Sequence, residues 1–152
     1  MNIRLDGIEY EEAETESALK AKIDNALKSV DVDISPDMFV RFHRSSAPYT
    51  NKDGKTVSQC IMRFASWKQR RQAHVGKKKA REEKLPIFIS HDLTKRRYDL
   101  FKTAARRLKQ LNIKDTFAFV DVNSNLAMRN AGKVAFFNTH DELNDLLNNI
   151  SR

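Results

Sequence analysis

The feature that most constrains the fold is the order in which apolar periodicity changes over the first 90 residues. Apolar and polar residues alternate over 2–8, 38–43, 57–64 and 85–90, which predicts four strands. The segments 15–30 and 66–83 have the spacing of helices instead. The order strand, helix, strand, strand, helix, strand predicts an α+β, ferredoxin-like domain, in which a four-stranded antiparallel sheet carries two helices on one face.

The alternation in the second predicted strand, residues 38–43, indicates which of its side chains lie on the uncovered face of that sheet. Strict alternation places Phe39, Arg41 and His43 on one side and Val40 and Phe42 on the other. A polar loop is expected to follow over 44–56.

The second helix is very basic and has few apolar residues. Ser66 is its expected N-cap, and Gly76 is expected to break or weaken it, with fraying beyond that point. Trp67, Ala73 and Val75 are the residues expected to pack against the sheet.

Residues 91–152 predict a second, small α+β domain after the first domain of 1–90. An amphipathic helix over 95–111 precedes a hairpin of 117–122 and 126–129 and a short strand over 133–137. Thr139 and Glu142 form the capping-box pattern of a closing helix. The phenylalanines of this domain are expected mostly in its core: Phe101, Phe117, Phe119, Phe136 and Phe137.

Positive charge is concentrated in the middle of the chain. Residues 63–109 contain 16 basic and four acidic residues, a net charge of +12, whereas the whole chain carries +8. The first 34 residues contain nine acidic and four basic residues, a net charge of −5. Charge segregated in this way indicates a binding surface for a polyanion.

Enzymatic and metal chemistry find little support in the sequence. The four histidines and the single cysteine, Cys60, lack metal-ligand spacing, and no hydrolase motif or phosphate-binding glycine loop is present. We therefore expect no catalytic residue, cofactor or metal. The single cysteine and the absence of a long apolar run predict an intracellular protein that does not span a membrane.

Several segments resemble a known family. The C-terminal half of the first-open-reading-frame protein of LINE-type retrotransposons is similar to NIRLDGIEYEEAETES, IMRF, FISHDLTKRRYDLFKTAARRL, FAFVDVNSNLAMRN and FFNTHDELNDLL. The second half also resembles the baculovirus few-polyhedra (FP) protein.

The resemblance implies a noncanonical RNA recognition motif followed by a small C-terminal domain. Such proteins bind single-stranded RNA or DNA and act as nucleic acid chaperones, in ribonucleoprotein particles of the cytoplasm or the nucleus. An upstream coiled coil would make the protein a homo-oligomer. Where ordinary RNA recognition motifs carry aromatic residues on the central strands, this chain has Arg4, Gln59 and Ile61, which shifts the expected contacts toward phosphates.

The expected contacts come from two sources. The resemblance carries over Arg4, Arg63, Lys95, Arg96, Arg97, Arg106, Arg107 and, more weakly, Arg129. The charge pattern adds Arg41, Arg70, Arg71, Lys77, Lys78, Lys79 and Lys102. Bases could stack on Phe39, His43 and Phe88. We expect cations from both halves to line one continuous groove for a phosphate backbone.

Other interpretations of the charge remain open. The lysine run at 77–79 is also typical of a solvated helix end or a nuclear-localisation signal, and the helix at 95–109 of a membrane-surface or calmodulin-binding helix. The main alternative function is a protein-interaction module, or a viral FP-like structural factor, whose basic surface docks an acidic partner.

Overall fold

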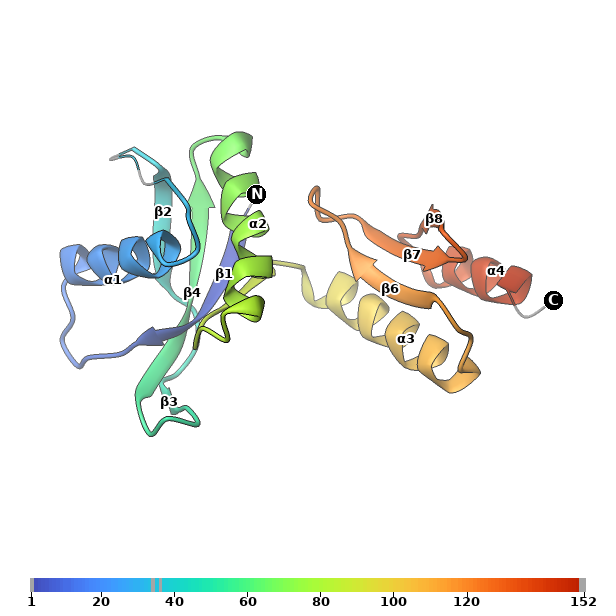
Figure 1. Cartoon of the computed structure of the whole chain (residues 1–152), viewed down its shortest axis with the longest axis horizontal. Coiled ribbons are helices and arrows are strands. Elements are labelled where there is room, and N and C mark those ends of the chain that lie inside the picture. Colours follow the sequence, from blue (N-terminus) through green and yellow to red (C-terminus); the bar gives the residue numbers. More distant parts are fainter. Residues whose placement is uncertain (1, 34, 36, 151–152) are drawn as a thin grey trace. The chain divides into compact units, whose positions relative to one another are not determined.

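The computed structural model describes residues 2–33, 35 and 37–150, and the chain divides into two compact units, Met1–Asp92 and Leu93–Arg152 (Figure 1). Each unit combines helices with an antiparallel sheet, which confirms the predicted α+β class. The division falls close to the boundary predicted after residue 90.

The first unit contains one antiparallel sheet and two helices. Its strands are β1 (Asn2–Glu9), β2 (Phe39–Arg44), β3 (Tyr49–Thr50), β4 (Thr56–Phe64) and β5 (Phe88–His91), and its helices are α1 (Glu16–Lys28) and α2 (Trp67–Glu82). The strand order is β2-β4-β1-β5, with β3 paired to β4, so β1 and β4 are central and β5 is an edge strand. The short β3 lies in the segment predicted to be a loop, which corrects that prediction.

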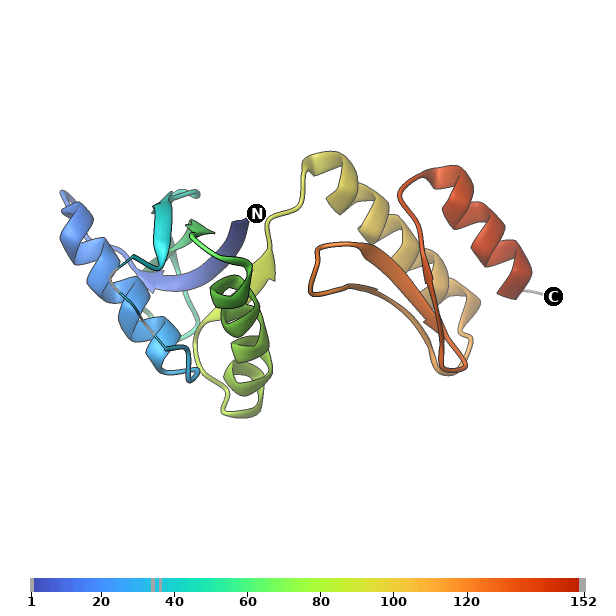
Figure 2. The same cartoon turned by 90° about the horizontal axis from the view of Figure 1, so that it is seen from above.

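Both helices of this unit cover the same face of the sheet (Figure 2). Along β1 and β4, every second side chain points toward α1 and α2, in agreement with the predicted alternation. The core contains Ile3, Leu5, Cys60, Met62 and Phe64 from the strands and Leu19, Ile23 and Leu27 from α1.

The prediction for β2 was wrong at its first residue. The register with β4 shifts between Phe39 and Arg41, which indicates a bulge around Val40. Phe39 therefore packs against the core, with its ring centroid 6.1 Å from that of Phe42 and 5.2 Å from that of Phe64. Val40 is 63% exposed instead.

The prediction that α2 breaks at Gly76 was also wrong. The helix is continuous, and a Cβ atom at Gly76 would lie 2.7 Å from Cγ2 of Val30, so glycine allows the close approach of α2 to the segment after α1. Trp67 and Val75, expected to pack, are 46% and 63% exposed. The side of α2 that is buried consists of Arg70, Ala73, Gly76 and Ala80.

The second unit contains a three-stranded antiparallel sheet with two helices on one face (Figure 2). Its elements are α3 (Lys95–Leu111), β6 (Thr116–Val120), β7 (Leu126–Asn130), β8 (Lys133–Phe136) and α4 (His140–Ile150). The bounds of α3 match the predicted helix, and Thr94 Oγ1 accepts the hydrogen bond of the Arg97 amide at its N-cap. Leu111, predicted on the apolar face, is 43% exposed. The core is formed by Leu93, Leu100, Ala104, Leu108, Leu126, Met128, Phe137, Leu143 and Leu147.

The environment of Cys60 makes its thiol unreactive. The side chain is fully buried in the first core, and this burial raises the pKa of the thiol to about 11. Because the thiolate is the nucleophile, we expect an aromatic disulfide reagent near neutral pH to label the folded protein at least about 100-fold more slowly than the urea-unfolded chain. Absorbance of the released thiolate measures both rates. Equal rates would contradict the burial of Cys60.

Candidate nucleic-acid interface

The face of the first sheet that is not covered by α1 and α2 gathers part of the predicted site. Inward-facing Ile3 and Met62 alternate with Arg4 and Arg63, which point to the opposite face. Arg41 of β2 is the register partner of Arg63. This uncovered face therefore carries three of the predicted cations.

The pair formed by Arg41 and Arg63 is electrostatically unusual. The two residues lie directly opposite each other on neighbouring strands, and both are exposed. Within residues 2–33, 35 and 37–150, neither forms an ion pair with a carboxylate. Like charges at directly opposed positions destabilise a sheet, so this pair would be stabilised by a bound anion.

Arg4 differs from that pair because it already has a carboxylate partner. Its Nε atom donates to Oδ1 of Asp92 at 2.8 Å, and its side chain is 38% exposed. The Asn2 amide donates to the other oxygen of the same carboxylate. Arg4 is therefore partly neutralised, although its side chain remains accessible.

Two of the three predicted stacking residues lie on the uncovered face. His43 pairs with Ile61 in register and is exposed, and Phe88 of the edge strand is 67% exposed. Phe39 is excluded because its ring is held in the core. The two exposed rings lie on opposite edge strands, separated by β4 and β1.

The predicted site wrongly included Arg70. Its side chain is 1% exposed, and its Nη2 atom lies 3.1 Å from Nδ1 of His91, on the covered side of the sheet. The spacing of Arg70 to Ala73 and Ala80 along one side of α2 was the sequence signal for this burial. A phosphate in solvent cannot reach this guanidinium.

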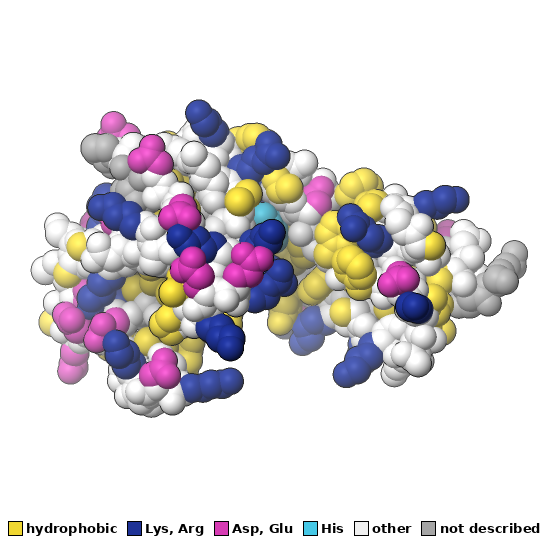
Figure 3. All heavy atoms as spheres, viewed as in Figure 1, with side chains coloured by type: hydrophobic (Ala, Val, Ile, Leu, Met, Phe, Trp, Pro, Cys, Tyr) yellow, Lys and Arg dark blue, Asp and Glu magenta, His cyan; other side chains and the backbone are white. Residues whose placement is uncertain are grey.

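The other predicted cations of α2 also lie on the helical side of the sheet, away from Arg41 and Arg63. Lys79 forms ion pairs with Asp31 at 2.6 Å and with Glu83 at 3.7 Å, and Lys78 pairs with Glu82 at 3.7 Å. Figure 3 shows basic and acidic side chains interspersed on this side of the first unit.

Arg71 and Lys77 complete this group: the Arg71 guanidinium lies 5.3 Å from the ring centroid of Trp67, and Lys77 is exposed. The expectation that the predicted cations form one continuous groove therefore fails within the first unit, because its sheet separates two groups.

The cations of α3 have two different environments. Lys95, Arg96, Lys102 and Arg106 are exposed, and Lys102 lies 5.1 Å from the ring centroid of Tyr98. Arg97 instead donates to the backbone oxygen of Ser124 in the hairpin turn.

Arg107 is also engaged within the second unit, where it donates to Oδ1 of Asn144 on α4. Arg97 and Arg107 are both half-buried. Sequence analysis did not anticipate these bonds, which connect α3 to the hairpin and to α4.

The uncovered face of the second sheet carries exposed aromatic rings that sequence analysis missed. Phe117 and Phe136, predicted as core, are 49% and 56% exposed, and Phe119 is half-buried beside them. The Arg129 guanidinium lies 5.8 Å from the ring centroids of both Phe117 and Phe119. Figure 3 shows hydrophobic side chains gathered on this unit, with basic side chains among them.

The sequence contained a signal for these exposed rings on the second sheet. In the segment FAFV, Ala118 and Val120 pack against the core, so strand alternation places Phe117 and Phe119 on the other face. Arg129 is the register partner of Phe117 and forms no ion pair with the described carboxylates. A cation among exposed rings can contact both a phosphate and a base.

Residues 2–33, 35 and 37–150 show neither a metal cluster nor a membrane-spanning helix. No three or more His, Cys, Asp or Glu side chains in these ranges are grouped to hold a metal ion. No helix in the same ranges is both long enough and apolar enough to cross a bilayer.

Comparison with known proteins found no match for this chain. No protein-family model matches the chain, and no curated protein matches it significantly.

Proposed function

We propose that this protein binds single-stranded nucleic acid through the uncovered faces of its two sheets. The observation that carries the proposal is the pair formed by Arg41 and Arg63, two exposed guanidinium groups on opposed strand positions with no carboxylate partner among the described residues. Cα atoms at such positions are about 4.5–5.5 Å apart, so one phosphate could contact both side chains. Arginine suits this contact because its planar group forms bidentate hydrogen bonds with phosphate.

Exposed rings on the uncovered faces of the two sheets favour a single strand over a duplex. Phe88 and His43 on the first sheet, and Phe117 and Phe136 on the second, could each stack an unpaired base. Stacking of this kind contributes about 1–3 kcal/mol per base and tolerates any base. Because arginine contacts to phosphate carry no sequence information, the binding would be weakly selective for sequence.

The strand order of the first unit supports an RNA recognition motif. The order β2-β4-β1-β5 with two helices on one face supports this part of the proposal, which rests on the resemblance to LINE-type first-open-reading-frame proteins. On this basis the protein would act as a nucleic acid chaperone in a retrotransposon-type or FP-like ribonucleoprotein particle. RNA is the proposed ligand, with single-stranded DNA as a second one.

The salt dependence of affinity tests the mechanism. If about six phosphates are contacted, the logarithm of the association constant for a single strand should fall with the logarithm of salt concentration at a slope of about −4, because bound counterions are released. Fluorescence anisotropy of a labelled oligouridine, titrated at several salt concentrations, measures this slope. An affinity that does not change with salt would contradict the proposal.

A further inference from the structure

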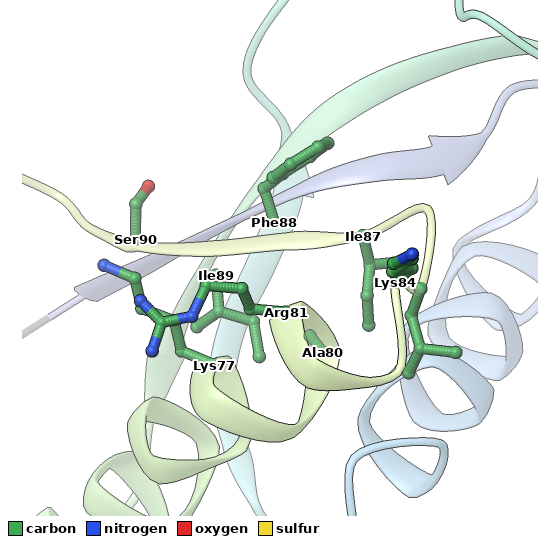
Figure 4. Close-up of a pocket in the computed structure, with 9 residues that line it drawn as sticks. Lys77, Ala80, Arg81, Lys84, Ile87, Phe88, Ile89 and Ser90 are labelled. Carbon is green, nitrogen blue, oxygen red and sulfur yellow. The ribbon is translucent and has the colours of Figure 1, made fainter.

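A pocket of about 550 Å³ lies between α2 and the edge strand β5 (Figure 4). Its apolar lining consists of the aliphatic Ala80, Leu85, Ile87 and Ile89, with Phe88 at its border. In Figure 4, Ile87 and Ile89 point toward α2, whereas Phe88 points away from it. The α2–β5 groove, as we call this pocket, therefore lies on the helical side of the sheet and is distinct from the uncovered face.

Three cations line the α2–β5 groove: Lys77, Arg81 and Lys84. The neighbouring Lys78 and Lys79 form ion pairs with acidic residues, but the three lining cations form none with the described carboxylates. No acidic residue lines the groove among the described residues. The groove thus combines an aliphatic floor with uncompensated positive charge, which fits a ligand that is both apolar and acidic.

The strand beside this groove has a free edge. β5 ends the strand order, and β1 is its only strand partner among the described residues. An edge strand offers backbone donors and acceptors to an added strand, and a groove between an edge strand and a helix can hold the side chains of that strand.

We propose that the α2–β5 groove binds an extended acidic peptide of a partner protein, which adds to β5 as a further strand. Side chains on one face of the peptide would enter the groove: apolar ones would fill the pocket, and carboxylates two residues along on the same face would pair with Lys77, Arg81 and Lys84. A nucleotide base fits less well, because the floor is aliphatic and the ring of Phe88 faces the other side of the sheet. This site is independent of the proposed nucleic-acid surface.

A synthetic peptide tests the proposal on the full chain. The probe is a fluorescent, end-blocked peptide with the repeat Val-Thr-Glu-Thr, which places valine and glutamate on the same face of a strand, and its control has the central valines replaced by proline, which cannot join a strand ladder. We expect saturable binding of the first peptide, at least about tenfold weaker binding of the proline peptide, and slower hydrogen exchange at Phe88–His91. Equal affinity for the two peptides would overturn strand addition.

Charge-reversal variants locate the site on α2. Lys77→Glu with Arg81→Glu should raise the Kd of the acidic peptide about tenfold or more, because attraction becomes repulsion. The matched control is Lys68→Glu with Lys78→Glu, which makes the same charge change at exposed positions of α2 outside the groove. At about physiological salt the control should change the Kd less than about threefold. Equal losses in both double variants would overturn the assignment.

Competition separates this site from the nucleic-acid surface. Unlabelled oligouridine should not displace the acidic peptide, and Arg41→Gln with Arg63→Gln should leave peptide binding unchanged. Complete displacement by oligouridine would overturn the proposal by assigning the α2–β5 groove to the polynucleotide. Failure of the wild-type protein to bind oligouridine, with peptide binding intact, would instead refute the proposed function and leave this inference standing.

Discussion

Replacing Gly7 with alanine is expected to destabilise the first unit by about 4 kcal/mol. Gly7 lies at the register shift of β1 with a φ of +87°, in the left-handed region where a side chain costs about 1–2 kcal/mol. An added Cβ atom would also lie 2.1 Å from the backbone oxygen of Pro86, in the segment that leads to β5. Because a backbone atom must move to relieve this overlap, we add a further cost of about 1–3 kcal/mol.

Gly54→Ala is the matched control for this substitution. Gly54 has a similar φ of +75°, but no heavy atom lies within 4 Å of its Cβ position, so only the backbone term of about 1–2 kcal/mol applies. Urea unfolding followed by the fluorescence of Trp67, the single tryptophan, reports on the first unit. Equal losses in the two variants would show that the approach of Pro86 to Gly7 is not as close as described.

Periodicity predicted the elements whose pattern is strong and local. The bounds of α3 were predicted correctly because an uninterrupted apolar stripe follows the N-cap Thr94. The strand predicted over 57–64 was likewise confirmed as β4, whose alternation buries Cys60, Met62 and Phe64.

The errors in the fold came from contacts between segments distant in sequence. A single bulge at Val40 returned Phe39 to the core, and no local pattern marks that bulge. Gly76 looks like a helix breaker by propensity, but its role is set by the approach of Val30.

Sequence analysis predicted only part of the candidate site, because the site also depends on contacts between segments distant in sequence. Alternation correctly placed Arg41 and His43 on the uncovered face. Neither charge counting nor the resemblance could tell which arginines have internal partners, so the predicted site included Arg70 and Arg97. Partners of this kind depend on tertiary packing, which residue counts do not contain.

Replacing Arg41 and Arg63 together with glutamine should weaken binding of single-stranded RNA about 100-fold. Each arginine is expected to contribute a charge-assisted hydrogen bond to phosphate, and the loss of about 1.5 kcal/mol for each gives about 3 kcal/mol in total. The same change removes a repulsion between opposed like charges, so the free energy of unfolding should stay constant or rise by up to about 1 kcal/mol. Weaker RNA binding, together with an unchanged or higher free energy of unfolding, would show that Arg41 and Arg63 serve binding and not folding.

The control for this double variant removes the same charge elsewhere in the unit. Lys52→Gln with Lys55→Gln changes two exposed cations of the loop between β3 and β4. Anisotropy titrations of a labelled oligouridine should show a salt slope that is smaller in magnitude by about 0.7 for the arginine variant, since the two arginines hold one phosphate and a single strand loses about 0.7 for each phosphate contact. The lysine variant should keep the slope of the wild type. If both variants lose affinity equally, diffuse attraction to the whole basic chain explains the binding, and the arginine pair is not the site.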